Sequence, residues 1–155
     1  MLFGIKGLQK FSPAGQIETA RVVEAIAEAE EITSAEIRVH YTVCGSKLPL
    51  LEEAQKVFEA LEMHKTENRN GVLIFLRLRK HEIAVIGDEG IHKHVGTEFW
   101  EAVKDEIIRN IKTGSITDGI IKGVHVVGKQ LSKYFAPSDE NPNELSNEVT
   151  KNKIY

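Results

Sequence analysis

The sequence predicts an α/β fold, a three-layer α/β/α sandwich with a small mixed sheet of three to four strands. The first observation is a central β-hairpin, in which the apolar runs 72–76 and 83–86 flank the charged turn 77–82. The first run is apolar at odd and even positions alike, which predicts a strand buried on both faces. The second observation is that apolar residues at helical spacing precede, separate and follow the strands.

The elements before the hairpin begin with residues 1–11, which we expect to form a packed arm. Ser12-Pro13 is typical of a helix N-cap followed by proline at the first helical position, and the apolar repeat continues to about Ile32. Residues 36–43 then alternate between apolar and polar side chains. This pattern predicts a half-buried strand near a sheet edge, with His40 and the other polar residues facing solvent.

A second helix is predicted between this strand and the hairpin. A strand, a helix and a strand in that order favour a right-handed crossover, with residues 36–43 parallel to the first hairpin strand. Ser34 and Glu36 would then lie at the same sheet edge as Asn70 and Asp88. The apolar stripe of the connecting helix is Leu50, Leu51, Ala54, Val57, Phe58 and Leu61.

The chain after the hairpin predicts two further helices. Residues 91–95 are expected to be a short link or a fragment of strand, and Thr97 to cap the first of these helices. Ser115, with Asp118 three residues later, resembles a capping box at the start of the last helix, which Pro137 ends. Few apolar residues follow. We therefore predict a single domain over residues 1–136 and a disordered polar C-terminal tail over 137–155.

The composition excludes several classes of protein. A net charge of −3 favours no contact with nucleic acid, and the single Cys44 allows no internal disulfide. The N-terminus lacks the pattern of a signal peptide, and no apolar run approaches the ~20 residues that span a bilayer. We expect a soluble cytoplasmic monomer with no membrane span. The sequence neither identifies nor excludes a protein partner.

Four segments resemble the TPM domain family: SAEIRVH at 34–40, LEMHKT at 61–66, NRNGVLIFL at 68–76 and IGDEGIHKHVGTEFW at 86–100. The likeness is strongest to its short soluble bacterial branch. Long members also tend to have a further loop glycine where Gly87-Asp88-Glu89-Gly90 stands here, so catalytic claims made for them transfer poorly. The resemblance implies an α/β/α sandwich, divalent-cation binding as described for some members, and a disputed phosphatase activity.

The hairpin ends supply the candidate metal site. Asp88, Glu89, Asn70 and Glu36 have the carboxylate and amide oxygens that hard cations such as calcium prefer. The expected cofactor is accordingly a divalent cation, with calcium as the candidate. The alternative is that these are ordinary loop residues, with Asp88 capping a neighbouring backbone group. Their spacing matches no EF-hand loop.

Other candidate residues have weaker patterns. Arg69 beside Lys65 could bind a phosphate, although such residues more often form a solvated helix end. His92 and His94 lack a convincing third metal ligand, so surface histidines are favoured. Cys44 has no evident histidine partner that would lower the pKa of a catalytic thiol.

Two functions of different class follow from these residues. The first is a non-catalytic binding or adaptor domain with a calcium-type cation site at the hairpin edge. The alternative is a weak metal-dependent phosphatase at the same site, with the cation as Lewis acid and Arg69 holding the phosphate. The first is favoured because no nucleophile with an adjacent base can be named, and no catalytic residue is assigned.

Overall fold

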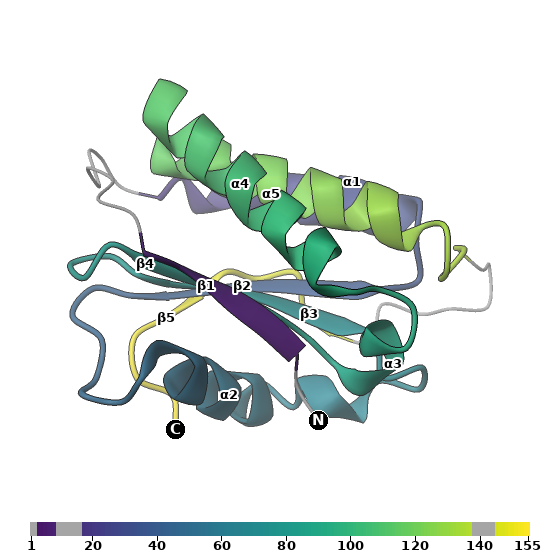
Figure 1. Ribbon diagram of the computed structural model, residues 1–155, viewed down its shortest axis with the longest axis horizontal. Helices are drawn as coiled ribbons and strands as arrows, with labels where there is room; N and C mark the ends of the chain where they lie inside the picture. The colour runs from purple at the N-terminus through teal and green to yellow at the C-terminus, as the bar shows by residue number, and fades with distance from the viewer. Residues whose placement is uncertain (1–2, 9–16, 138–144) are drawn as a thin grey trace.

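A mixed β-sheet forms the middle layer of the protein, as the computed structural model shows (Figure 1). The structure describes residues 3–8, 17–137 and 145–155. Within them the elements are β1 (Phe3–Leu8), α1 (Thr19–Glu31), β2 (Glu36–Thr42), α2 (Leu50–Ala60), the 3-10 turn η1 (Met63–Lys65), β3 (Gly71–Arg77), β4 (Glu82–Gly87), α3 (Glu89–His92), α4 (Thr97–Thr113), α5 (Ile116–Leu131) and β5 (Thr150–Lys151).

The strands lie in the order β1-β4-β3-β2-β5. β3 and β4 form the predicted antiparallel hairpin, and β2 pairs with β3 in parallel, as the crossover argument predicts. β1 extends the sheet antiparallel to β4, and β5 runs parallel to β2. The described part of the sheet thus has five strands, because both terminal segments, which had not been predicted as strands, add one at an edge.

Helices cover both faces of the sheet, which confirms the predicted α/β sandwich (Figure 1). Helices α1, α4 and α5 lie on one face, and α2 lies on the other. β3 is buried along its whole length because its alternate side chains enter two separate cores. The core under α1, α4 and α5 includes Val72, Ile74, Trp100, Ile107, Ile120 and Val124, and the core under α2 includes Leu50, Phe58, Leu73, Phe75 and Ile86.

The helix boundaries follow local sequence signals. α5 begins with the predicted capping box, in which the Ser115 hydroxyl accepts from the Asp118 N–H at 3.1 Å and the Asp118 carboxylate accepts from the Ser115 N–H at 3.0 Å. The predicted start of the first helix at Ser12-Pro13 falls outside the described residues. Residues 91–95 differ from the expected link or strand, because Ile91 and His92 belong to the short helix α3 that Asp88 caps.

The prediction of a half-buried β2 near an edge is wrong in one respect. Its polar side chains do not face solvent, since Glu36, Arg38, His40 and Thr42 are all buried. The cover is the C-terminal segment: β5 pairs with β2 through His40 and Tyr41. Over residues 145–155 the chain is therefore not the disordered tail that its composition had predicted, whereas residues 138–144 fall outside the described part.

No helix in the described ranges is long and apolar enough to cross a membrane. Neither α4 nor α5 contains such a run, because charged and polar residues interrupt both.

Candidate functional site

The starts of β2 and β3 and the end of β4 meet at one edge of the sheet. Glu36 is paired with Gly71, and the Glu36 N–H donates to the Asn70 carbonyl at 3.2 Å. On the other side of β3, the Asp88 N–H donates to the Gly71 carbonyl at 3.0 Å. The predicted convergence of these strand ends is confirmed, so their polar residues lie at one edge of the sheet.

The loop before β3 has a constrained backbone at this edge. Arg69 adopts a left-handed conformation with φ of 49°, which non-glycine residues rarely occupy. Its carbonyl accepts a hydrogen bond of 2.9 Å from the Gly90 N–H. A Cβ on Gly90 would lie 2.1 Å from the Asn68 carbonyl oxygen and 2.5 Å from that of Arg69. Glycine at position 90 therefore permits α3 to lie directly against the loop.

The Arg69 side chain binds both acidic residues of the following loop. Its Nε and Nη2 atoms donate to the two Asp88 carboxylate oxygens at 2.8 and 3.0 Å, and Nη1 donates to Glu89 Oε1 at 3.1 Å. The Asp88 side chain is fully buried, whereas that of Arg69 is 39% exposed. The hydrogen bonds to Asp88 raise the pKa of Arg69. The two-pronged geometry is the strong form of an arginine–carboxylate pair.

Asp88 and Glu89 are thus brought together, as the sequence predicts, but around a guanidinium group. Asp88 Oδ1 also accepts from the Glu89 N–H at 2.8 Å, so the capping role considered as the alternative is present as well. The Arg69 guanidinium group, expected to hold a phosphate, has its donors directed at these two carboxylates. Lys65, expected beside Arg69, pairs instead with the exposed Glu62 at 2.6 Å.

Asn70 is buried at the same edge but has other partners. Its amide donates to the Ser34 carbonyl at 3.2 Å, and its backbone N–H donates to the Thr66 hydroxyl at 3.1 Å. Among the described residues its Oδ1 atom finds no hydrogen-bond donor. Asn70 therefore provides a buried oxygen with unused acceptor capacity beside the loop of Arg69.

Glu36 belongs to a separate acidic pair with Glu30 of α1. Burial, followed by the charge of Glu36, raises the pKa of Glu30 to about 8. Glu30 also accepts from the Ile37 N–H at 3.5 Å, so it covers the part of the β2 edge that β5 does not reach. Of the four expected ligands, Asp88 and Glu89 share one position, while Asn70 and Glu36 contact other groups.

This arrangement fits a metal ion only in part. No group of three or more His, Cys, Asp or Glu side chains in the described ranges is positioned to hold one. The two carboxylates suit a hard cation, but Arg69 already neutralises them. A divalent cation at this position would have to replace the guanidinium group.

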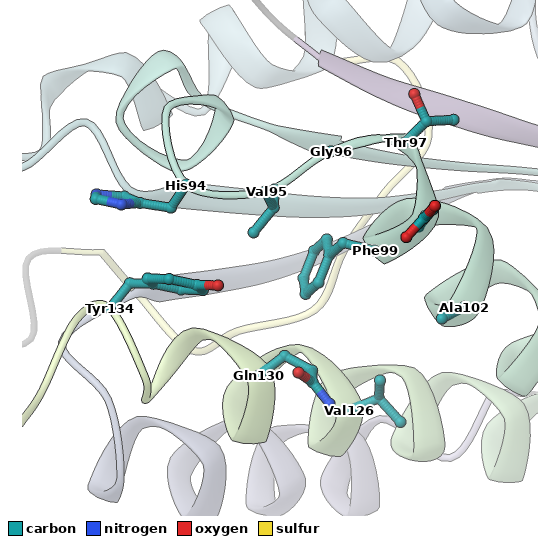
Figure 2. A pocket seen from close by; sticks show the side chains of 10 residues that line it. His94, Val95, Gly96, Thr97, Phe99, Ala102, Val126, Gln130 and Tyr134 are labelled. Atoms are coloured by element: carbon teal, nitrogen blue, oxygen red, sulfur yellow. The ribbon is translucent and has the colours of Figure 1, made fainter.

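A cavity of about 630 Å³ lies between the start of α4 and the end of α5. Figure 2 shows the Phe99 ring pointing into it, with Val126 and Gln130 of α5 on the opposite wall. The rings of His94 and Tyr134 stack at 5.0 Å and form one end. The volume is within the usual range of ligand pockets. This cavity was not predicted from the sequence. The available signal was the presence of aromatic residues, Phe99 and Tyr134, near the start of α4 and after the end of α5.

The remaining candidate residues are dispersed. His92 ends α3, and His94 stacks on Tyr134, so the pair does not follow the expected strand geometry. His40, expected at the surface, is fully buried between β2 and the C-terminal segment. Cys44 is exposed in the loop after β2.

Comparison with known proteins identifies the family. A model of the TPM domain matches residues 11–130. The chain belongs to the TPM domain family. The NMR structure of the BA42 protein from the psychrophilic bacterium Bizionia argentinensis is similar, with 34% identity and a TM-score of 0.80 over 87% of this chain and 92% of that one. No curated protein matches the chain.

The match covers the parts of this TPM domain that build the site. It includes α1 to α4, nearly all of α5 and both carboxylate residues of the Arg69 cluster. The residues after position 130, including β5, lie beyond it. The family relationship therefore accounts for the sandwich and the hairpin edge, while β5, which covers part of β2, lies outside the matched residues.

Proposed function

We propose that this TPM domain is a non-catalytic binding module, in which a divalent cation of the calcium type competes with Arg69 for the carboxylates of Asp88 and Glu89. The observation that supports the proposal is the cluster itself. A fully buried carboxylate is bound by a guanidinium group that remains 39% exposed, so the positive partner can leave towards solvent while the negative one stays in place.

The charge balance favours a divalent partner. Arg69 contributes one positive charge to two carboxylates, which leaves the three-residue cluster with one net negative charge. A cation of charge two between Asp88 and Glu89 would neutralise both. The buried Oδ1 atom of Asn70, which has no donor among the described residues, offers a further hard oxygen near this edge.

Binding is favoured over phosphate hydrolysis for a chemical reason. A phosphatase at this edge would need Arg69 to hold the phosphate, but its donors are directed at carboxylates. Both carboxylate oxygens of Asp88 already accept hydrogen bonds, from Arg69 and from the Glu89 N–H, so this carboxylate is poorly placed to act as the base that activates a nucleophile. We expect no turnover of an aryl phosphate with calcium or magnesium, and metal-dependent turnover that is lost in Asp88→Asn would support hydrolysis instead.

Thermal melting during a calcium titration tests the cation site. A ligand that binds only the folded state stabilises it by about 2.7 kcal/mol at 100 times its dissociation constant, so the melting temperature of the wild type should rise with calcium. Asp88→Asn removes the buried charge at nearly constant size and should abolish the rise.

The matched control is Asp105→Asn, which makes the same change at an exposed position of α4. Its melting temperature should respond to calcium as the wild type does. The proposal fails if calcium leaves the wild type unchanged, or if Asp88→Asn responds as strongly as the control.

A further inference from the structure

The C-terminal segment, residues 145–155, lies along β2 in the way that a bound peptide adds a strand to a sheet. Thr150 is paired with His40 and Lys151 with Tyr41, in parallel orientation. The Asn152 N–H then donates to the Tyr41 carbonyl at 2.8 Å. These contacts use the backbone of β2, which would otherwise present an open edge to other strands.

Three hydrogen bonds that involve side chains anchor the segment at two separate points. His40 Nε2 lies 2.8 Å from the Asn152 carbonyl, and Nδ1 lies 2.7 Å from the Thr150 hydroxyl. Because a carbonyl only accepts, Nε2 carries the proton, and in the neutral ring Nδ1 accepts from Thr150. Further along, the Tyr155 hydroxyl donates to Glu53 Oε2 of α2 at 2.9 Å. The β2 edge and α2 therefore have side-chain partners for a hydroxyl residue at position 150 and for a tyrosine at position 155.

The segment covers both polar and apolar groups of the domain. Arg38 Nη2 donates to the Glu148 carbonyl at 3.5 Å, and His40 contacts Thr150 and Asn152. Leu145 and Tyr155 pack against the core under α2, and Val149 packs against the core under α1, α4 and α5. An incoming segment with the same sequence would cover the same groups, so none of them would stay exposed after exchange.

We infer that the β2 edge is a peptide-recognition groove, and that its partner is the 145–155 segment of a second copy of this chain. Strand addition would supply backbone hydrogen bonds for affinity, while His40 and Glu53 would supply specificity. The second copy is favoured because its segment reproduces each contact of the resident one, so exchange loses no native interaction. This inference does not depend on the proposed cation site.

The first experiment uses the full chain with a protease site introduced within residues 138–144. After cleavage, a fluorescently labelled peptide with the sequence of residues 145–155 is added, and its anisotropy is measured. We expect saturable binding that unlabelled peptide reverses. Peptides with Tyr155→Phe or Thr150→Val should bind roughly tenfold more weakly, as the loss of one well-placed hydrogen bond predicts.

The matched control peptide has Lys151→Ala, since Lys151 is exposed and contributes its backbone to the pairing. It should bind as the unchanged peptide does. The proposal that β2 forms a peptide-recognition groove would be overturned if the peptide did not bind. It would also be overturned if a peptide with the same residues in scrambled order bound equally well. Circular dichroism establishes that the cleaved chain stays folded.

A second measurement uses the uncut chain. It tests the proposal even if the cleaved chain unfolds. Light scattering after size-exclusion chromatography should show a dimer whose share rises with the concentration at which the protein is incubated. Tyr155→Phe should leave that share nearly unchanged, because the Tyr155–Glu53 contact is present once per chain in the monomer and in the exchanged dimer. A chain that stays monomeric at millimolar concentration would overturn the second copy as partner, even if the peptide binds.

Discussion

Nε and Nη2 of Arg69 lie 2.8 and 3.0 Å from the two carboxylate oxygens of Asp88, and the pair joins the loop before β3 to the cap of α3. Each residue is also held through its backbone, since Gly90 donates to the Arg69 carbonyl and Asp88 donates to that of Gly71. The loop before β3 and the start of α3 are therefore joined twice, once through the Arg69–Asp88 side-chain pair and once through backbone hydrogen bonds. A change to any of these groups should affect both the fold and the proposed cation site.

Removing the guanidinium group of Arg69 should have two distinct effects, one on stability without calcium and one on the response to calcium. Arg69→Gln leaves Asp88 buried without its charge partner, so we expect a loss of about 2 kcal/mol in the free energy of unfolding without calcium, discounted for the exposure of Arg69. The calcium response should become larger than in the wild type, because the competing cation is absent.

A double-mutant cycle with Asp88→Asn, followed by denaturant unfolding, checks the pairing. The combined change should cost less than the two single changes added together, with a coupling of about 1–2 kcal/mol. Additive effects would mean that the pair contributes little, and a weaker calcium response in Arg69→Gln would contradict the competition.

Gly90 should tolerate no side chain. In Gly90→Ala the new methyl group would meet two backbone carbonyl oxygens at 2.1 and 2.5 Å, which are held by the loop before β3. We expect a loss of about 3 kcal/mol, measured by denaturant unfolding, because α3 would have to move away. Gly96→Ala is the control, since a Cβ there has no neighbour within 4 Å. Equal stability of the two variants would contradict the close approach.

Glu30 should make stability depend on pH. Its pKa is about 8 in the folded state against 4.5 ordinarily, mainly through burial and then through Glu36. Between these values the folded state keeps a proton that the unfolded state releases, so this contribution to stability falls as pH rises from 4.5 to 8. Glu30→Gln removes the titration, so it should match the wild type near pH 4.5 and exceed it by about 1–2 kcal/mol above pH 8, after discounting for partial exposure.

Melting curves of wild type and Glu30→Gln across this pH range provide the measurement. His40 has the opposite dependence, because burial lowers its pKa and its protonation in acid favours the unfolded state. It is present in both proteins, so the difference between them isolates Glu30. Glu24→Gln, an exposed acid of the same helix, is the control. A constant difference between pH 4.5 and 8 would contradict the raised pKa.

Truncation after Ala136 should destabilise the domain, in contrast to the small effect that a disordered tail predicts. The deletion removes the contacts of His40 with Thr150 and Asn152, and it leaves the buried Glu53 without the Tyr155 hydroxyl. At about 1 kcal/mol for each hydrogen bond, the melting temperature should fall by roughly 5 °C or more. An unchanged melting temperature would restore the predicted domain boundary at residue 136.

Local pattern was sufficient for most of the fold. The apolar runs of the hairpin, the helical stripes and the Ser115–Asp118 capping box depend on residues a few positions apart, and the structure confirms each of them. Chain-topology rules then placed Glu36, Asn70 and Asp88 at one edge, because parallel pairing of β2 with β3 follows from the crossover between them. Membership of the TPM domain family was also recognisable from these segments.

The tertiary structure decided which of these polar groups contact one another. Arg69 reaches Asp88 because its backbone is left-handed and Gly90 permits a close approach, and neither condition is visible in residue types or spacing. Likewise, the alternation in β2 marks His40 as exposed, but Thr150, 110 residues later in the chain, covers it. Periodicity records the polarity of a strand's face, whereas burial depends on whatever distant segment packs there. His40 is buried because Thr150 and Asn152 contact both of its ring nitrogens.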